Sequence, residues 1–378
     1  MTQETDTRRT NGTGEAVTAD GATTDRERAT DDAYAIAGEG IEVTYSDGTR
    51  AVRGVDLHVP RGEFFGFLGP NGAGKTTTIK TLSTLLSPTG GSVRVNGFDV
   101  ATESRKVRES IGYMAQETSV DPELTARENI RFACEAYGVP RGERAERIDE
   151  LLDLADLADV ADKEADEFSG GMKKRLDAAT ALVHRPPLVF LDEPTTGLDP
   201  KARNRLWDYF RRINEQGTTV FLTTQYLEEA DQLCDRLSVI AEGEIVATGS
   251  PDELKRRVGG EILDIELAGV EGVDPGSGDA AAGADDGDAD PRQRAVAVAR
   301  EADLFTDAAV ETTADGLTVT AEDARAHGTD LLVALRDAGI GVTGFNIRAP
   351  TLDDVFLAIT GEELDEADED AEAAEVTA

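Results

Sequence analysis

The stretch that decides the fold is FFGFLGPNGAGKT, residues 64–76, in which an apolar run leads directly into a glycine loop. Residues 69–76 fit the spacing G-x-x-x-x-G-K-[ST]. The apolar run predicts a strand before the loop, and the apolar spacing from Thr76 to Leu86 predicts a helix after it. Glycines let backbone N–H groups turn toward phosphate oxygens, and a helix N-terminus favours an anion. The stretch therefore predicts a phosphate-binding loop.

The residues of this loop have separate expected roles toward ATP and Mg²⁺. Lys75 would place a point charge at the β- and γ-phosphates, and Thr76 would offer its hydroxyl to the metal. The whole cradle is expected from consecutive residues: Gly69, Pro70, Asn71, Gly72, Ala73, Gly74, Lys75, Thr76 and Thr77. We therefore expect ATP and Mg²⁺ as the cofactors.

Two carboxylates follow a second apolar strand, Leu188 to Leu191. Charge at the tip of a buried strand is costly unless it is used. Asp192 is expected to hold Mg²⁺, directly or through water, and Glu193 to polarise the attacking water as general base. Taken alone, the pair is also typical of a solvated strand end, but the phosphate-binding loop favours the metal and base roles.

A third motif is Phe-Ser-Gly-Gly-Met, residues 168–172, at the start of a predicted helix. Ser169 followed by Gly170 and Gly171 leaves several backbone N–H groups free, which suits an anion. Without the other motifs this would be interpreted as an ordinary helix N-cap.

The surrounding pattern predicts an α/β fold with a parallel sheet. Order is expected to begin near Ile41, after a disordered tail over residues 1–33. Residues 125–160 read as helical, broken near 138–140, with a capping box of Thr125 and Glu128. The remaining expected elements are strands at 41–45, 51–59, 111–114 and 218–223, helices after 169 and at 200–215 and 227–234, and a hairpin turning at 242–243.

The C-terminal third has a different composition and its own expected order of elements. A strand at 262–267, a helix at 294–304, two strands around 315–316, a helix at 323–338 and a strand at 341–348 give βαββαβ, which suggests a small ferredoxin-like domain. Residues 276–290 read as an acidic Gly/Ala loop. We expect domains at 34–260, with a helical subdomain over about 117–185, and at 261–361, followed by an acidic tail at 362–378.

Charge and cysteine content exclude several classes of protein. Acidic residues outnumber basic ones 76 to 38, a net charge of −38, which argues against nucleic acid or an anionic membrane surface as a partner. Only 8 basic residues are Lys, and an acid-rich, Lys-poor chain suggests a halophilic host, where molar salt cuts the Debye length to about 3 Å. The distant Cys134 and Cys234 indicate no disulfide framework, and no apolar run reaches the length of a membrane span.

Together, the motifs resemble the ATP-binding cassette (ABC) family over roughly residues 38–260. The series is Tyr45, the loop at 69–76, Gln116, the Ser169 helix, Asp192-Glu193 and the run 196–199 that ends in Asp199. The resemblance implies a P-loop NTPase (RecA-like) core with an antiparallel β subdomain and a helical insertion. It also implies that two cassettes stack head to tail, with ATP between one copy's loop and the other copy's Ser169, Gly170 and Gly171.

The resemblance assigns the remaining site residues. Tyr45 matches the aromatic residue that stacks on adenine, Gln116 the glutamine that contacts Mg²⁺ and senses the membrane partner, and Asp199 the aspartate that links the two sites. The sequence departs from the family at Met172, where glutamine is usual, and at Gln225, where most members have a histidine on the γ-phosphate. Gln225 can donate a hydrogen bond but carries no charge, so slower turnover, or more reliance on Glu193, is expected.

The motifs that contain Met172 and Gln225 resemble those of the daunorubicin-resistance type of exporter ATPase. The late run from Pro350 to Leu357 resembles the same type. That resemblance implies an ATPase that drives a separate membrane permease, at the cytoplasmic face of the membrane, to export a hydrophobic compound or drug. The partner cassette is either another copy or a relative, and we predict a homodimer because one chain carries the motifs for both faces of the sandwich. The late run is either a motif for assembly and domain communication or a capped helix, Asp353 to Thr360, that packs on the small domain.

Three other functions compete with the exporter. A soluble cassette ATPase without a transport partner usually carries two cassettes or a long coiled coil, and neither is evident. A regulator without catalysis is suggested by Gln225, but Lys75, Asp192 and Glu193 argue against it. Another P-loop enzyme, such as a GTPase or small-molecule kinase, would not be expected to carry the Ser169 helix before the second carboxylate strand.

Overall fold

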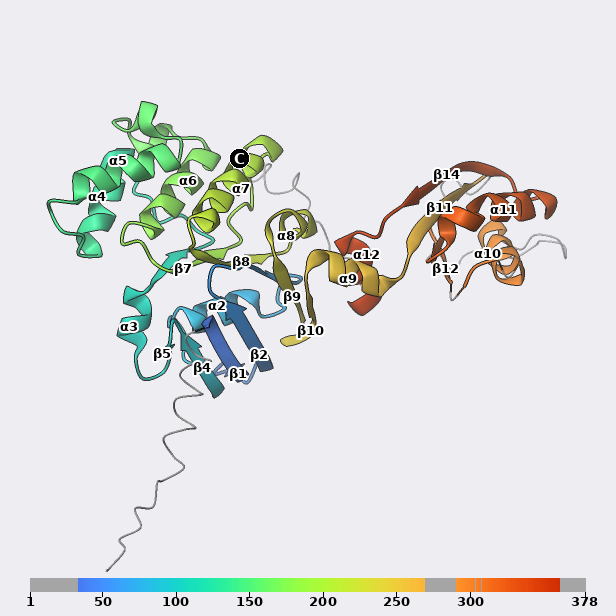
Figure 1. Ribbon diagram of the computed structural model, residues 1–378, viewed down its shortest axis with the longest axis horizontal. Coiled ribbons are helices and arrows are strands. Elements are labelled where there is room, and N and C mark those ends of the chain that lie inside the picture. Colours follow the sequence, from blue (N-terminus) through green and yellow to red (C-terminus); the bar gives the residue numbers. More distant parts are fainter. Residues whose placement is uncertain (1–32, 269–289, 303, 307, 361–378) are drawn as a thin grey trace, which may run out of the picture.

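The computed structural model describes residues 33–268, 290–302, 304–306 and 308–360. The described chain forms a larger N-terminal part and a smaller C-terminal part that projects from it (Figure 1). The expected tails at 1–33 and 362–378 lie outside the described residues, apart from Ala33, as does the acidic loop apart from Asp290. Among the described helices, none is both long and apolar enough to cross a membrane.

A six-stranded sheet forms the centre of the larger part. Its order is β10-β9-β3-β8-β7-β6, with β6, β7, β8, β3 and β9 parallel and β10 antiparallel at one edge. Every residue of β3, β7 and β8 is buried, as expected for apolar strands covered on both faces. The strands are β3 (Phe64–Leu68), β6 (Ile111–Met114), β7 (Leu188–Asp192), β8 (Thr219–Thr224), β9 (Arg236–Ala241) and β10 (Glu244–Gly249).

An antiparallel sheet of order β2-β1-β4-β5 shares an apolar core with one side of this sheet and with α2 (Lys75–Leu82). Its strands are β1 (Tyr34–Thr44), β2 (Arg50–Pro60), β4 (Gly90–Val95) and β5 (Phe98–Asp99), and α3 (Ser104–Glu109) follows them. The expectation that order begins near Ile41 is wrong, because Ile36 is fully buried and pairs with Val95. The helix expected to reach Leu86 also ends earlier, at Leu82.

Helices cover the other side of the central sheet. They are α4 (Ala126–Ala136), α5 (Arg144–Leu154), α6 (Gly170–Ala181), α7 (Pro200–Glu215) and α8 (Leu227–Leu233), with short 3-10 turns η1 (Ala158–Val160) and η2 (Ala165–Glu167). The capping box is confirmed: Thr125 Oγ1 accepts from the backbone N–H of Glu128, whose Oε2 accepts from that of Thr125. The break is confirmed too, since Gly138 has a φ of 72° between α4 and α5.

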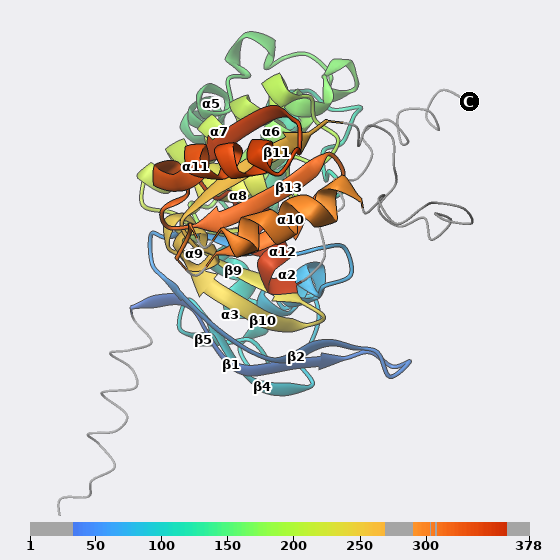
Figure 2. The ribbon, with the colours of Figure 1, turned by 90° about the vertical axis from the view of Figure 1, so that its right-hand side faces the viewer.

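The C-terminal part is ferredoxin-like, as predicted. Its sheet has the order β12-β13-β11-β14, and α10 and α11 lie on one side of it (Figure 2). The elements are β11 (Glu261–Leu267), α10 (Pro291–Glu301), β12 (Ala309–Thr312), β13 (Gly316–Ala321), α11 (Ala324–Asp337) and β14 (Val342–Arg348). Asp290 caps α10, which therefore begins three residues before the predicted Arg294.

The last helix, α12 (Leu352–Thr360), overturns one of the two interpretations of the run from Pro350 to Leu357. It packs on α9 (Pro251–Val258) and α8 rather than on the small domain. Leu352, Val355 and Phe356 are buried in the apolar cluster that also contains Leu227 and Leu254. The chain thus returns from the ferredoxin-like sheet to finish the core of the larger part.

Arg348 marks the point of this return. Its guanidinium pairs with Asp264 of β11 at 2.9 Å and with Asp354 of α12 at 2.6 Å. Thr351 caps α12, because its hydroxyl accepts from the backbone N–H of Asp354. These contacts fix the angle at which β14 leads into α12.

Candidate active site at the carboxyl edge of the central sheet

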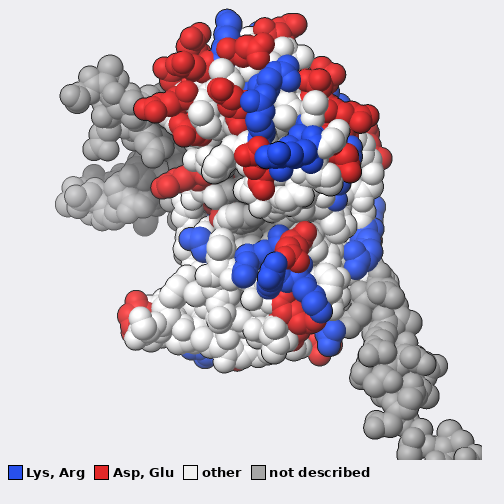
Figure 3. All heavy atoms as spheres, turned by 90° about the vertical axis from the view of Figure 1, so that its left-hand side faces the viewer, with Lys and Arg blue, Asp and Glu red and all other residues white. Residues whose placement is uncertain are grey.

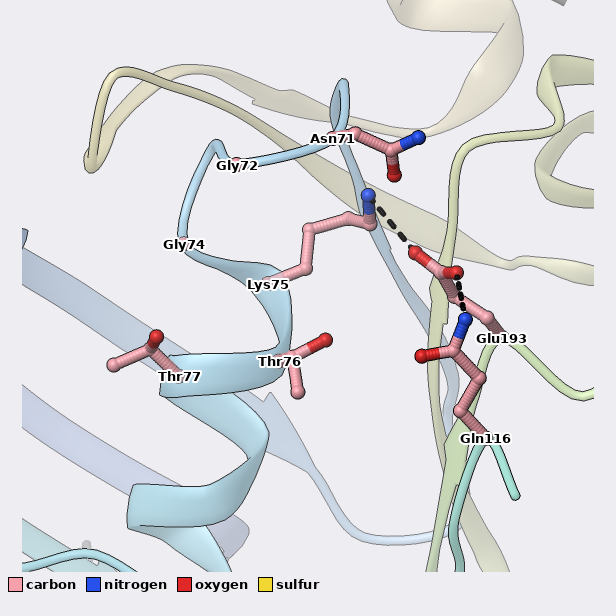
Figure 4. A pocket seen from close by; sticks show the side chains of 8 residues that line it. All are labelled: Asn71, Gly72, Gly74, Lys75, Thr76, Thr77, Gln116 and Glu193. Atoms are coloured by element: carbon pink, nitrogen blue, oxygen red, sulfur yellow. Dashed lines mark hydrogen bonds and ion pairs between the residues drawn. The ribbon is translucent and has the colours of Figure 1, made fainter. Parts of the chain in front are cut away.

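The glycine loop leaves β3 at the carboxyl edge of the sheet and turns into α2, as predicted. Gly72 and Gly74 have φ values of 81° and 108°, which favour glycine. At Gly69 and Gly74 a Cβ atom would lie 2.3 Å from Ile240 O and 2.5 Å from Ala51 O. The loop borders a cavity of about 170 Å³ lined by Asn71, Gly72, Gly74, Lys75, Thr76, Thr77, Gln116 and Glu193 (Figure 4).

Lys75 and Glu193 face each other across this cavity. The Lys75 Nζ donates to Gly69 O at 2.8 Å and Pro70 O at 3.1 Å, and lies 3.1 Å from Glu193 Oε1. Gln116 Nε2 donates to Glu193 Oε2 at 3.3 Å (Figure 4). Side chains from the β3 loop, the β6 loop and the end of β7 therefore converge on one point.

Glu193 reaches this point through an uncommon backbone conformation. Its φ is 45°, in the left-handed region, which costs a non-glycine residue roughly 1 kcal/mol or more. Its backbone N–H donates to Thr223 O at 3.0 Å, which holds the turn after β7 against β8. The turn directs the carboxylate into the cavity beside Lys75.

Asp192 ends β7 and receives hydroxyl groups from three elements. Thr223 Oγ1 donates to its Oδ1 at 2.6 Å, Thr76 Oγ1 to the same oxygen at 3.5 Å, and the Tyr113 hydroxyl to Oδ2 at 3.5 Å. Burial raises the pKa of Asp192, the Thr223 hydrogen bond lowers it, and the Glu193 charge raises it again, for a net rise. Burial and the Asp192 charge raise the pKa of Tyr113.

Sequence analysis did not select Thr223 or Tyr113. A signal was present for Thr223, because it stands at the carboxyl end of β8, where Asp192 ends the neighbouring parallel strand. Tyr113 lies within β6, and its contact with Asp192 depends on strand order. Polar residues at the same end of two adjacent parallel strands thus indicate side chains that contact each other at the edge of the sheet.

Tyr45 lies beside the glycine loop. It follows the last residue of β1, and its hydroxyl lies 2.9 Å from Thr77 Oγ1. The side chain is 40% exposed, so its ring is accessible at the margin of the loop.

The other proposed residues do not line the cavity of their own chain. Ser169 caps α6 through the Met172 N–H and is exposed with Gly170. Asp199 caps α7 through the Ala202 N–H at 2.9 Å and is also exposed. Gln225, half-buried, follows β8 outside the lining residues. The proposed residues therefore form two subsets: one lines the cavity or contacts its lining residues, and one lies apart from the cavity.

Two protein families match separate segments of the chain. The ABC transporter family matches residues 52–196, and the C-terminal domain family of DrrA1-3-like ATP-binding proteins matches residues 249–360. The daunorubicin resistance ATP-binding protein DrrA3 of Streptomyces coeruleorubidus is 41% identical over 331 residues, 87% of this chain and 96% of that protein. The linearmycin resistance ATP-binding protein LnrL of Bacillus subtilis is 37% identical over 236 residues, 62% of this chain and 76% of that protein.

Solved structures share the fold of the larger part. The structure of cbiO1 from Clostridium perfringens, part of the ABC transporter complex cbiONQ, has a TM-score of 0.54 and 29% identity, covering 60% of this chain and 94% of its own. A cassette solved as a dimer with ADP and Pi in a post-hydrolysis state has a TM-score of 0.52 and 28% identity, covering 57% and 98%.

A P-loop whose lysine meets the second carboxylate of a strand-end pair on a parallel sheet defines a P-loop NTPase. The chain belongs to the ABC transporter family, in the group of daunorubicin-resistance ATP-binding proteins. It is therefore an ATPase, with ATP as its nucleotide.

Proposed function

We propose that this chain is the ATP-hydrolysing subunit of an exporter and drives a separate membrane permease to export a hydrophobic compound or drug. The observation that carries the proposal is the similarity along 87% of the chain, C-terminal part included, to a protein named for daunorubicin resistance. Under this proposal residues 34–260 are the ATP-binding domain, with a helical subdomain over about 117–185, and residues 261–361 are the C-terminal domain.

Mg²⁺ fits the oxygen-rich end of β7. Asp192 would hold the ion together with Thr76 and Gln116, since hydroxyl, carboxylate and amide oxygens suit a hard cation. Once bound, the ion would neutralise charge on the β- and γ-phosphates. Lys75 would exchange its contact with Glu193 for the phosphates, and Glu193 would then be free to polarise water.

The remaining loop residues would bind the nucleotide itself. Backbone N–H groups from Gly69 to Thr77 would surround the phosphates, and the exposed ring of Tyr45 would stack on the base. Gln225 would donate a hydrogen bond to the γ-phosphate from the end of β8.

The residues that lie apart from the cavity support a homodimer. Ser169, Gly170 and Gly171 at the start of α6, and Asp199 at the start of α7, are separate from the cavity of their own chain. In a head-to-tail pair they would complete the cavity of the second copy. One chain carries both subsets, so two identical copies would suffice.

The permease would dock on the helical subdomain. Phe132 of α4 is 70% exposed and Tyr137 45% exposed, close in sequence to the end of the loop that carries Gln116. Figure 3 shows acidic side chains over the upper, helical part of the face drawn, with basic patches among them. The net charge of −38 argues against nucleic acid as a partner. The chain would reach the cytoplasmic face of the membrane through the permease.

The high acidity adds a proposal about the host. A net charge of −38 repels itself strongly at low salt and is tolerated where ions screen it. We therefore place the protein in a salt-rich, halophilic cytosol, and assays belong in molar KCl.

The test is capture of the tagged chain from gently solubilised membranes of its host in molar KCl, with mass spectrometry of bound proteins. We expect a polytopic membrane protein, lost in Phe132→Ala and retained in the control Leu85→Ala, since Leu85 is 59% exposed outside the helical subdomain. Recovery of the chain without any membrane protein would overturn the exporter and favour a cassette ATPase without a transport partner.

A further inference from the structure

The segment between β6 and α4 is attached to α6 by two side chains. Lys174 Nζ donates to Gln116 O at 2.5 Å. Asp177 Oδ1 accepts from Ser119 Oγ at 2.5 Å and from the Ser119 N–H at 3.2 Å. Lys174 and Asp177 are three residues apart in the helix and therefore share one face of α6.

Both attachments use ionisable side chains that are shielded from solvent, Asp177 being buried and Lys174 half-buried. Asp177 is 2% exposed, and burial raises its pKa while the Ser119 hydrogen bonds lower it. Burial lowers the pKa of Lys174, and the Asp177 charge opposes that shift. Among the described residues, Asp177 Oδ2 has no hydrogen-bond partner. Burying such groups is costly, so their use here to hold a loop is a specific arrangement.

The attached segment and the helix each carry one proposed ATP contact. Gln116 extends its side chain to Glu193 in the cavity, while its carbonyl is held by Lys174. Ser169 caps the same helix, five residues before Lys174. Lys174 therefore links the backbone of Gln116, which lines the cavity, to α6. The exposed N-terminal end of α6 would contact the ATP bound to the second copy.

We infer that Lys174 and Asp177 are positioning residues that make the Gln116–Ser119 segment and α6 move as one body. A displacement of the segment, by a membrane partner or by the nucleotide, is then transmitted to Ser169, and the reverse. The inference rests on the proposed roles of Gln116 and Ser169. It adds to them the two side chains that connect one ATP site to the other.

The first test is a double-mutant cycle on the ATPase activity of the full chain in molar KCl. We expect Lys174→Met to lower kcat about tenfold with little change in KM for ATP, because only the position of Gln116 is altered. Gln116→Ala should lower kcat similarly, and the double variant should be no slower than the slower single variant. If the two losses multiply, Lys174 does not act through Gln116 and the inference is wrong.

Lys173→Met is the matched control. Lys173 is adjacent to Lys174 in the same helix. Among the described residues, the Lys173 side chain makes no hydrogen bond or ion pair, whereas Lys174 donates to Gln116 O. The control removes the same charge, so its kcat should stay at the wild-type value. An equal loss in both Met variants would assign the effect to charge and overturn the inference.

The second test measures hydrogen exchange of residues 116–120 and 169–173 by mass spectrometry, with Glu193→Gln added so that ATP remains intact. With Lys174 and Asp177 present, ATP should protect both segments at the same nucleotide concentration. With Lys174→Met and Ser119→Ala, protection of 169–173 should no longer be accompanied by protection of 116–120. Ser119→Ala removes only a hydroxyl, so it avoids the folding risk of a change at Asp177.

Both tests use the chain without a permease. Additive losses, or joint protection in the uncoupled variant, would overturn this inference and leave the exporter proposal untouched. Failure to capture a membrane protein would overturn the exporter proposal and leave this inference untouched.

Discussion

Glu193 is where backbone conformation and electrostatics meet most closely in this site. A left-handed φ of 45° directs its carboxylate toward Lys75, and both side chains are nearly buried. An incoming phosphate competes with this carboxylate for Lys75. The same residue thus restrains the loop lysine before ATP binds and, in our proposal, activates water afterward.

We predict that Glu193→Gln retains ATP binding and loses about 10²–10⁴-fold in phosphate release, the usual contribution of a general base. The neutral amide also leaves Lys75 free for phosphate, so an ATP-bound dimer should accumulate at high KCl. Size-exclusion chromatography with light scattering measures the dimer, and the exposed Glu215→Gln provides a charge-matched control. A Glu193→Gln chain that stays monomeric with ATP would contradict the head-to-tail pairing.

Single residues of the cavity were accessible to sequence analysis when their role follows from local spacing. Lys75, Thr76 and Asp192 belong to short motifs, and the structure brings them together. Thr223 and Tyr113 were missed because their contact with Asp192 depends on which strands become neighbours. Strand order is a property of the whole sheet, so the local sequence of Tyr113 gives no signal, and that of Thr223 gives only its position at the end of a strand.

At the scale of elements, α6 and α7 approach each other at Gly171. A Cβ atom there would lie 2.8 Å from the Cβ of Ala202, whereas at Gly170 the nearest atom, of Leu198, would be 3.6 Å away. The second glycine of the motif therefore has a packing role within its own chain, apart from any role toward ATP.

We predict that Gly171→Ala destabilises the chain by about 1–3 kcal/mol, as overpacking does. Gly170→Ala should change stability by no more than about 0.5 kcal/mol, and both variants should lose activity if the two glycines bind phosphate. Thermal unfolding in molar KCl compares the two variants. Equal stability losses would mean that the helices adjust without cost.

A second prediction at this scale concerns Glu229 of α8, which is fully buried and accepts a hydrogen bond from Trp207 Nε1 of α7 at 3.0 Å. Burial raises its pKa from 4.5. The neutral Glu229 carboxyl therefore makes its complete contribution to the free energy of unfolding below pH 4.5. This contribution is lost as the pH rises through the raised pKa of the folded state. Glu229→Gln keeps the shape and removes this loss.

We expect Glu229→Gln to unfold at a higher temperature than the wild type at pH 8, and the difference to vanish toward pH 4.5. A gain of about 1 kcal/mol would correspond to roughly 2–4 °C in a domain of this size. Glu228→Gln, exposed on the same helix, should show no such trend. A lower Tm for Glu229→Gln at pH 8 would show that the charge is stabilising.

Elements with strong end signals were predicted well. The capping box at Thr125 and the proline-led start of α7 fixed helix starts to the residue. The strands β4 and β5 were not predicted, because β4 begins with two glycines, β5 has only two residues, and each is stabilised by its partner strand, β4 by β1 and β5 by β4. The first residues of β1, before Ile41, were not predicted as a strand because small residues dominate there and their burial comes from the partner strand.

At the scale of the whole molecule, α12 connects the two parts. Phe356 is 2% exposed in the core of the larger part, while Leu357 on the same helix is 36% exposed. Sequence analysis identified this helix, and one of its two interpretations placed the helix on the small domain. Its true partner is α9, about a hundred residues earlier, which only the tertiary structure places beside it.

We predict that Phe356→Ala costs about 3–5 kcal/mol, the usual loss for a buried aromatic side chain. Hydrogen exchange should rise in α8 and α9 of the larger part more than in the ferredoxin-like sheet. Leu357→Ala should have an effect of roughly 0.5 kcal/mol. Faster exchange confined to β11 and β14 would place the helix with the small domain after all.

The late return of α12 has a consequence for synthesis on the ribosome. At about 5–20 residues per second, roughly 5–20 s separate the emergence of α9 from that of Phe356. During that interval the apolar surface around Leu254 and Leu227 lacks its cover. A nascent chain of this protein is therefore a substrate for chaperones until its last helix is made, and any early stop codon in the C-terminal third leaves that surface permanently open.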